Sequence, residues 1–112
     1  MDTKVNKTSR IRELNDALRR TFTGGQIMLT SGVDALPPDV KAKVLQAVRT
    51  FDAFDKGNDP HKEHDFGSFE VGGETYFFKV DYYWADMQGG SEDPADPKVT
   101  TRVLTIMLAW EY

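Results

Sequence analysis

The densest group of side chains that could do chemistry lies in the segment 58–67, which holds both histidines of the chain. His61 and His64 are three residues apart, and Glu63 and Asp65 flank His64. Imidazole and carboxylate groups together suit zinc, manganese or iron, and three converging groups are enough for a mixed site. We expect no cofactor, and the segment offers as an alternative a divalent metal site with His64 and Asp65 as candidate ligands.

The same segment also supports a structural interpretation. A histidine pair spaced by three in a loop lacks the helical register that presents two imidazoles to one ion. In this interpretation Asp59 caps a turn before Pro60, and Asp65 or His64 bonds to loop backbone. The metal site and the loop-bonding role are therefore alternatives.

Carboxylates near His64 also suit general acid–base catalysis. Glu63, His64 and Asp65 precede a predicted strand, and Asp81 lies on the next strand. The four side chains meet if the register of the two strands permits it. Such a group would suit a small metal-dependent hydrolase or nuclease.

Lys79, Asp81 and Tyr83 alternate along one predicted strand and share one of its faces. If helices cover the opposite face, these side chains form an aromatic and charged surface that suits a partner. Asp93 and Asp96, in the acidic loop that follows, complete the set of candidate partner-binding residues. The alternative is an exposed Lys79–Asp81 ion pair of little energetic value.

The distribution of charge is more informative than its total. The chain holds 14 basic and 18 acidic side chains, a net charge of −4, which is too mild to predict direct nucleic-acid binding. Residues 1–25 hold six basic and three acidic side chains, a local +3, whereas residues 50–96 hold 12 acidic side chains and three lysines, a local −9. An acidic middle of the chain can dock on a basic protein or nucleoprotein partner.

Composition and length exclude several classes of protein. The chain has no cysteine, which rules out disulfides, thiolate zinc sites and a cysteine nucleophile. Its longest apolar run is the five residues 106–110, so we expect a cytoplasmic protein without a signal peptide or membrane span. At this length we expect one α+β domain over residues 1–112, with residues 1–7 as a disordered tail.

Apolar residues at spacings of three and four predict two helices. The first has Thr8 or Ser9 as its N-cap and stops at Gly24-Gly25. The second begins at Pro37-Pro38-Asp39, where a proline and an acid suit a helix start. Their buried stripes are Ile11, Leu14, Leu18 and Phe22 in the first, and Val40, Val44, Ala47, Val48 and Phe51 in the second.

Alternating apolar and polar residues predict four strands. Their ranges are 26–30, 66–71, 74–84 and 100–112. Gly72-Gly73 would join the second and third strands as a tight hairpin. Long polar loops are expected at 52–65 and 85–98. The expected fold is α+β, with a small, mainly antiparallel four-stranded sheet and two helices packed on one face.

One face of the strand 74–84 must turn toward the helices. We predict the face with Tyr76, Phe78, Val80, Tyr82 and Trp84, because the opposite choice would bury Lys79 and Asp81 at a high energetic cost. A slip of one residue would exchange the two faces. The predicted contacts of this face are Val44, Val48, Leu104, Ile106 and Leu108.

Five blocks of sequence carry a resemblance to a known family. They are Leu14-Asn15-Asp16 with Arg19-Arg20, Asn58-Asp59-Pro60 followed by residues 63–67, residues 79–83, residues 93–97, and residues 102–105 with Ala109. On these blocks the chain resembles an uncharacterised family of small alphaproteobacterial proteins that is common on plasmids and mobile elements. In that family the position of His61 is often another residue, so the resemblance favours His64 as a site residue. Such genes tend to accompany plasmid maintenance and anti-restriction genes, and the resemblance implies no activity.

Small size, the local −9 and the absence of a cofactor motif favour a non-enzymatic interaction protein. Its expected setting is that of a mobile-element accessory protein or a host-defence antagonist of the anti-restriction or anti-CRISPR type. An acidic surface would compete for the arginines and lysines with which a nucleoprotein holds phosphate. The alternative is the metal-dependent hydrolase or nuclease built on Glu63, His64 and Asp65.

Overall fold

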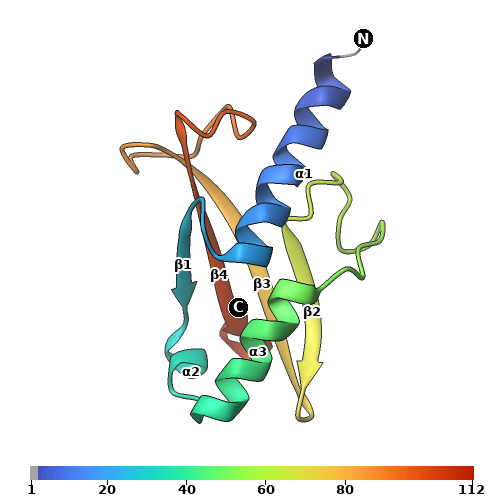
Figure 1. Cartoon of the computed structure of the whole chain (residues 1–112), viewed down its shortest axis with the longest axis vertical. Helices are drawn as coiled ribbons and strands as arrows, with labels where there is room; N and C mark the ends of the chain where they lie inside the picture. Colours follow the sequence, from blue (N-terminus) through green and yellow to red (C-terminus); the bar gives the residue numbers. More distant parts are fainter. Residues whose placement is uncertain (1–2) are drawn as a thin grey trace.

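The computed structural model describes the backbone of residues 3–112 and the side chains from residue 7 onward. The chain forms a helix, a strand, two helices and three strands in that order, followed by a short 3₁₀ helix (Figure 1). The bounds are α1 Thr3–Thr21, β1 Gln26–Leu29, α2 Ser31–Asp34, α3 Pro38–Thr50, β2 Phe66–Val71, β3 Glu74–Trp84, β4 Thr100–Leu108 and η1 Ala109–Glu111. None of the described helices is long and apolar enough to cross a membrane.

The four strands form one sheet in the order β1-β4-β3-β2. β3 pairs antiparallel with β2 and with β4, whereas β1 runs parallel to β4, with Ile27 opposite Leu104. The sheet is therefore mixed: two of its three strand pairs are antiparallel, as expected of a mainly antiparallel sheet, and the parallel β1–β4 pair was not predicted. The parallel pair is possible because two helices and the β2–β3 hairpin separate β1 from β4, and parallel strands require a long connection.

The β2–β3 hairpin has the predicted strand bounds. Gly72 and Gly73 have φ values of +61° and +85°, the left-handed conformation that tight hairpin turns require at both central residues. A Cβ atom at either position would meet no neighbouring atom. Backbone conformation, and not crowding, is therefore the reason for the glycine pair.

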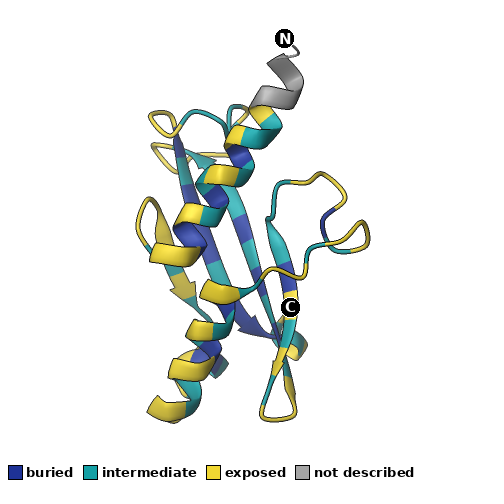
Figure 2. Ribbon diagram, turned by 45° about the vertical axis from the view of Figure 1, so that its right-hand side comes forward, coloured by how far each residue is buried: buried dark blue, intermediate teal, exposed yellow. Residues whose placement is uncertain are grey.

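α1 and α3 lie on the same face of the sheet, and no α-helix of the described chain covers the opposite face (Figure 1). Buried residues gather on the sheet and on the helix faces turned toward it (Figure 2). The core consists of Leu18, Val33, Val44, Val48, Tyr76, Phe78, Val80, Leu104, Ile106 and Leu108. The predicted orientation of β3 is therefore confirmed for its first three inward residues and for all five of their predicted partners.

The end of β3 contributes less to the core than we predicted. Tyr82 packs against the core from its edge, and Trp84 is half-buried outside it. Lys79 and Asp81 lie on the opposite face, where their side chains are 38% and 37% exposed. The register of the hairpin thus follows the alternation of apolar and polar residues.

α1 begins before the predicted N-cap residues. It starts at Thr3, so it includes most of the segment 1–7 that we expected to be a tail, and residues 1–2 lie outside the described residues. The Ser9 hydroxyl accepts a hydrogen bond from Arg12 Nη2 at 3.4 Å within the helix. Serine favours the first position of a helix, but the Ser9 side chain here bonds to a residue of the same helix and lies within it.

β4 ends four residues earlier than we predicted, at Leu108. The Glu111 carboxylate accepts hydrogen bonds from Leu108 N at 2.9 Å, Thr30 Oγ1 at 2.6 Å and Gly32 N at 2.9 Å. These bonds lower the pKa of Glu111, with the Thr30 bond as the largest cause. They turn the chain into η1 and fasten it to the corner between β1 and the unpredicted α2.

Candidate functional site

Polar side chains of α1, the 52–65 loop, β3 and β4 meet in one hydrogen-bonded network beside the core. Asn15 is fully buried. Its Nδ2 donates to Tyr82 Oη at 2.7 Å and to the Glu63 carbonyl at 3.0 Å, and its Oδ1 accepts from Arg102 Nε at 2.8 Å. Tyr82 Oη donates in turn to Glu63 Oε1 at 2.7 Å. Asn15 thus links a guanidinium to a carboxylate through the tyrosine hydroxyl.

Arg102 is 2% exposed. Its guanidinium lies 5.2 Å from the centre of the Tyr82 ring, and its Nη2 donates to the Pro94 carbonyl. Burial lowers the pKa of Arg102. Burial, followed by the hydrogen bond to Glu63, raises the pKa of Tyr82. Tyr82 is therefore protonated at neutral pH and acts as a hydrogen-bond donor. The guanidinium of Arg102 is surrounded by neutral acceptors and by the face of an aromatic ring.

His64 stands between two carboxylates. Its Nδ1 donates to Asp16 Oδ1 at 2.9 Å, and its Nε2 is 3.6 Å from Asp59 Oδ2. The backbone N–H of His64 donates to Asp59 Oδ1 at 3.0 Å, and its ring stacks on Phe54 with 3.8 Å between the ring centres. These contacts hold His64 in a left-handed conformation with φ of +57°, which is uncommon for a bulky residue.

Arg19 joins α1 to the end of α3. It is 1% exposed, and its Nη2 pairs with Asp16 Oδ1 at 3.0 Å. Its Nη1 donates to the carbonyls of Val48 at 3.1 Å and Phe51 at 2.7 Å. Burial lowers the pKa of Arg19, and the hydrogen bond to Asp16 opposes that shift. Arg19 thereby donates to carbonyl groups at the end of α3, where backbone partners are few.

The predicted catalytic set is not assembled in one place. Glu63 lies in the network on the helix side of the sheet, and His64 bonds to Asp16 of α1 beside it. Asp65 follows them, half-buried, and burial raises its pKa, with nearby Glu63 as a smaller cause. Asp81 lies on the opposite face and pairs with Lys79 at 2.8 Å. Asp81 therefore does not join Glu63, His64 and Asp65, as the hydrolase hypothesis requires.

The candidate metal ligands also have protein partners. Both ring nitrogens of His64 face carboxylates, those of Asp16 and Asp59. Within the part of the chain that the structure describes, no group of three or more histidine, aspartate or glutamate side chains is arranged to hold a metal ion. Asp59 does bond to loop backbone, but its carboxylate accepts the N–H of His64, five residues further along the chain, and not that of a turn before Pro60.

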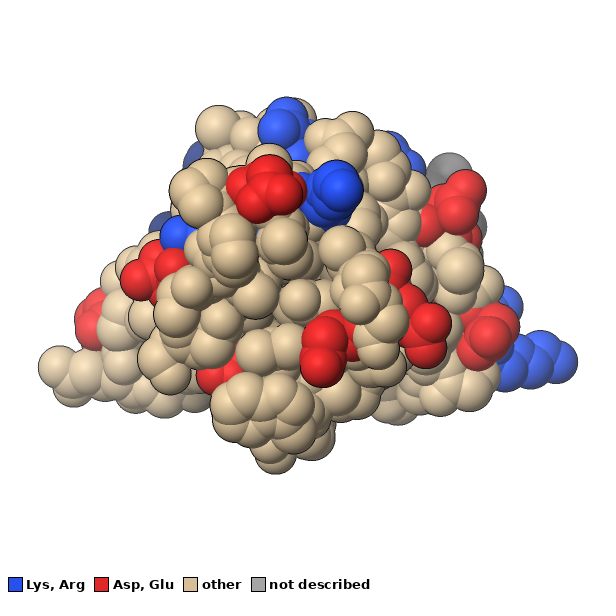
Figure 3. Space-filling model, turned by 90° about the horizontal axis from the view of Figure 1, so that it is seen from below, with Lys and Arg blue, Asp and Glu red and all other residues tan. Residues whose placement is uncertain are grey.

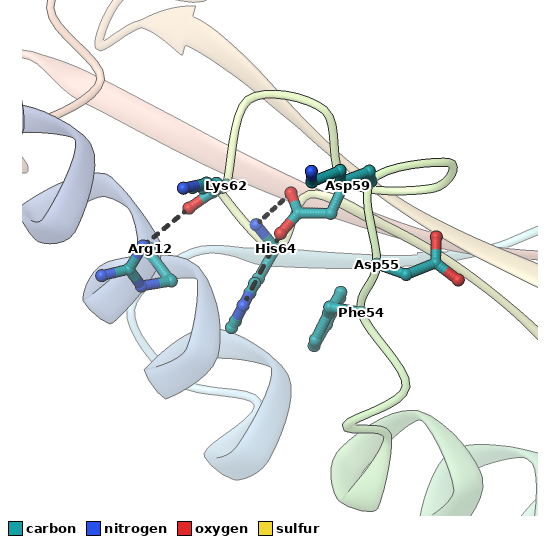
Figure 4. Close-up of a pocket in the computed structure, with 7 residues that line it drawn as sticks. Arg12, Phe54, Asp55, Asp59, Lys62 and His64 are labelled. Carbon is teal, nitrogen blue, oxygen red and sulfur yellow. Dashed lines mark hydrogen bonds and ion pairs between the residues drawn. The ribbon is translucent and has the colours of Figure 1, made fainter.

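A pocket of about 280 Å³ opens beside His64, between α1 and the 52–65 loop (Figure 4). The ring of His64 and the ring of Phe54 lie side by side at the pocket, and Arg12 of α1 lies close to Lys62 of the loop. The lining residues are Arg12, Phe54, Asp55, Lys56, Asp59, Lys62 and His64.

The predicted partner-binding residues of β3 lie on the face of the sheet that no described α-helix covers, which we call the helix-free face. Lys79 and Asp81 form their ion pair there, and the hydrogen bond to Asp81 raises the pKa of Lys79. Tyr83 follows on the same face, half-buried. The aromatic rings of Phe66 and Phe77 contact each other beside the ion pair, with 5.2 Å between their centres. These side chains therefore lie on the expected face, and their role in binding a partner stays a prediction.

Asp93 and Asp96 lie away from this strand face, in the loop between β3 and β4. Asp96 N donates to the Asp93 carbonyl at 3.1 Å, and Asp96 Oδ1 accepts from Lys98 N at 2.9 Å. Both aspartates are half-buried. Their backbone and side chains build a turn at the end of the sheet, next to the Pro94 carbonyl that binds Arg102.

The family described as "Protein of unknown function (DUF3768)" matches residues 29–111. The chain belongs to this family. The predicted resemblance to a family of unknown function is thus confirmed, while its plasmid and mobile-element setting stays a prediction. No curated protein and no solved structure matches the chain. The DUF3768 match includes the 52–65 loop, β3 and β4 but not α1, which supplies the centre of the network.

Each of the five sequence blocks that carried the resemblance supplies one member of the network. They supply Asn15, Glu63, Tyr82, Pro94 and Arg102. We did not predict these contacts from the sequence, although one signal was available. Asn15 is four residues after Ile11 and three before Leu18, so it lies on the apolar stripe of α1, where a polar residue needs a buried partner.

Proposed function

We propose that this member of the DUF3768 family is a non-enzymatic protein-binding module whose partner docks on the helix-free face of the sheet. The observation that supports this proposal is the composition of that face. It carries an aromatic group next to a charged pair, and no α-helix of the described chain covers it. Interfaces with protein partners combine aromatic anchors with polar groups in this way.

The aromatic group extends to the residues after η1. Tyr112 is 76% exposed, and its ring centre is 5.7 Å from that of Phe77 and 6.4 Å from that of Phe66. Met28, on β1, is 51% exposed, and β1 register places it beside Thr105 on this face. Exposed apolar groups that lie close together on one face are typical of an interaction surface.

The charge of the chain favours a basic protein as the partner. The local −9 of residues 50–96 includes Asp81 on the face and Asp93 and Asp96 in the adjoining loop. Seen from below, at one end of the molecule, acidic side chains form separate spots among residues of other types, with some basic side chains between them (Figure 3). An excess of acidic groups suits a protein partner with arginines or lysines, such as a nucleoprotein of a host-defence system that a mobile element would antagonise.

The polar network supports a role without catalysis. Tyr82 and Glu63 bond to each other, and His64 has a carboxylate at each ring nitrogen. A general acid or base must reach a substrate proton, and these groups are occupied by protein partners. The network therefore serves as a support that fixes α1 and the 52–65 loop on the sheet.

The test is affinity capture from the natural host with three baits. The wild-type chain is expected to retain a specific basic protein. A variant with Asp81→Lys is expected to lose it, because an acidic contact on the face becomes repulsive. Glu13→Lys is the matched control, since Glu13 is exposed on α1, away from the sheet face.

The captured protein is then titrated, in purified form, into each variant. An affinity that Asp81→Lys leaves unchanged would contradict the proposed surface. Equal losses of affinity in Asp81→Lys and in Glu13→Lys, which change the charge by the same amount, would indicate a general charge effect and also contradict it.

A further inference from the structure

The pocket between α1 and the 52–65 loop combines a rigid aromatic wall with three cationic side chains. Phe54 and His64 stack with an interplanar angle of 3°. Arg12, Lys56 and Lys62 contribute the positive charge (Figure 4). The balance between these cations and the two lining aspartates decides what the pocket can bind.

Both lining aspartates are engaged by the protein itself. Asp55 Oδ1 accepts hydrogen bonds from Gly57 N at 2.8 Å and Asn58 N at 3.0 Å. Asp59 is 5% exposed, and its carboxylate faces the backbone and the ring of His64. Their negative charge is therefore directed mainly at groups of the 52–65 loop.

The three cations have no such partners. Among the ion pairs of the described residues, none includes Arg12, Lys56 or Lys62. Arg12 Nη1 donates to the Lys62 carbonyl at 3.1 Å and Arg12 Nη2 donates to the Ser9 hydroxyl, both of which are neutral acceptors. The pocket lining thus holds three cations and two aspartates, and none of the three cations is in an ion pair with a carboxylate of the described chain.

We propose that this pocket binds the phosphate group of a small molecule. A phosphate dianion can accept from a guanidinium and two ammonium groups at once, whereas a carboxylate offers one charge and two oxygens. The volume of about 280 Å³ suits a small ligand. The wall is prearranged, because Lys62 and His64 are held at φ of +59° and +57° and the ring of His64 is fixed by Asp16.

This site is independent of the proposed docking face. It lies between α1 and the loop, whereas Lys79 and Asp81 lie on the opposite side of the sheet. Loss of phosphate binding would leave the protein-docking proposal unchanged, and the reverse also holds.

The test is a titration of the isotope-labelled protein, followed by NMR, with inorganic phosphate, with adenosine 5′-monophosphate and with adenosine. Saturable shifts are expected for the amides of Phe54, Lys62 and His64 with the two phosphate-bearing probes and not with adenosine. Equal affinity for both phosphate probes would assign free phosphate as the ligand. Tighter binding of the nucleotide would assign a phosphate ester that also contacts the Phe54 ring.

Lys56→Gln combined with Lys62→Gln is expected to weaken binding about tenfold. Both lysines are exposed, so the double variant should keep its fold, which the melting temperature checks. Lys43→Gln, an exposed lysine on α3, is the matched control and should bind as the wild type does. Absence of saturable shifts with both phosphate probes would overturn the proposal, and so would equal weakening per removed charge in the double variant and the Lys43 control.

Discussion

Arg102 keeps its charge in a nearly solvent-free position with no ion-pair partner among the described residues. The cost of removing an arginine from water is high. Here the guanidinium donates to Asn15 and Pro94 and lies over the Tyr82 ring. Asn15 in turn donates to the Tyr82 hydroxyl, and Tyr82 donates to the Glu63 carboxylate, so hydrogen bonds connect Arg102 to Glu63. Such a network fixes geometry, because each member needs all of the others to be in place.

Asp65 provides a pH-dependent test at the same scale. Burial raises its folded-state pKa, so its contribution to stability is fully present below its unfolded pKa of about 4 and is lost as pH rises through the folded pKa. At pH 7 the wild type therefore carries a buried charge that Asp65→Asn removes. We expect the variant to have a free energy of unfolding higher by up to about 1 kcal/mol at pH 7.

Urea unfolding at several pH values measures this difference. The advantage of Asp65→Asn should shrink toward pH 3, because Asp65 is then neutral in both states. Asp52→Asn, at an exposed position of the same loop, is the control and should show no comparable gain. A stability difference that stays constant from pH 3 to pH 7 would contradict the assigned cause.

At the scale of elements, local signals were sufficient for the hairpin and for α3. Gly72-Gly73 and strict alternation determine the ends of β2 and β3, and the proline-rich start defines α3. The parallel pairing of β1 with β4 has no local signal, since it depends on where the chain returns after four further elements. The burial of Arg19 and Arg102 was not predicted for another reason. Arginine is normally exposed, and only the tertiary partners of these two side chains reveal that they are buried.

The orientation of β3 predicts a contrast between two adjacent substitutions. Phe78 is fully buried between β4 and the Phe51 ring, whereas Lys79 lies on the helix-free face. Phe78→Ala should destabilise the protein by about 3–5 kcal/mol, because it leaves a cavity in the core. Lys79→Ala should cost less than about 1 kcal/mol, since it removes a partly exposed ion pair. Chemical denaturation of both variants measures these values, and similar losses would contradict the orientation.

At the scale of the whole molecule, folding rearranges the charge pattern of the sequence. The basic first 25 residues contain α1, which lies against the acidic 52–65 loop and contributes Arg12 to the pocket. The helix-free face lies on the other side of the sheet. The two proposed sites therefore have separate surfaces, and occupation of one does not block the other.

The sheet order also predicts how stability is distributed. β4 has β1 on one side and β3 on the other, while β1 and β2 are the edge strands. Amides of β4 and β3 should exchange with deuterium most slowly, because opening them requires disruption of the whole core. Hydrogen–deuterium exchange of the intact protein measures this, and slower exchange in β2 than in β4 would contradict it.

The position of β4 has a consequence for synthesis on the ribosome. Residues 100–108 are translated after every other strand, yet they form the partner on which β1 and β3 both depend. Before they emerge, the nascent chain can form only the two-stranded β2–β3 hairpin, which is marginal in water. Tyr76 and Phe78 stay uncovered on their β4 side during that interval. Folding of the sheet must therefore wait until translation has passed residue 108, and the growing chain exposes aggregation-prone strands until then.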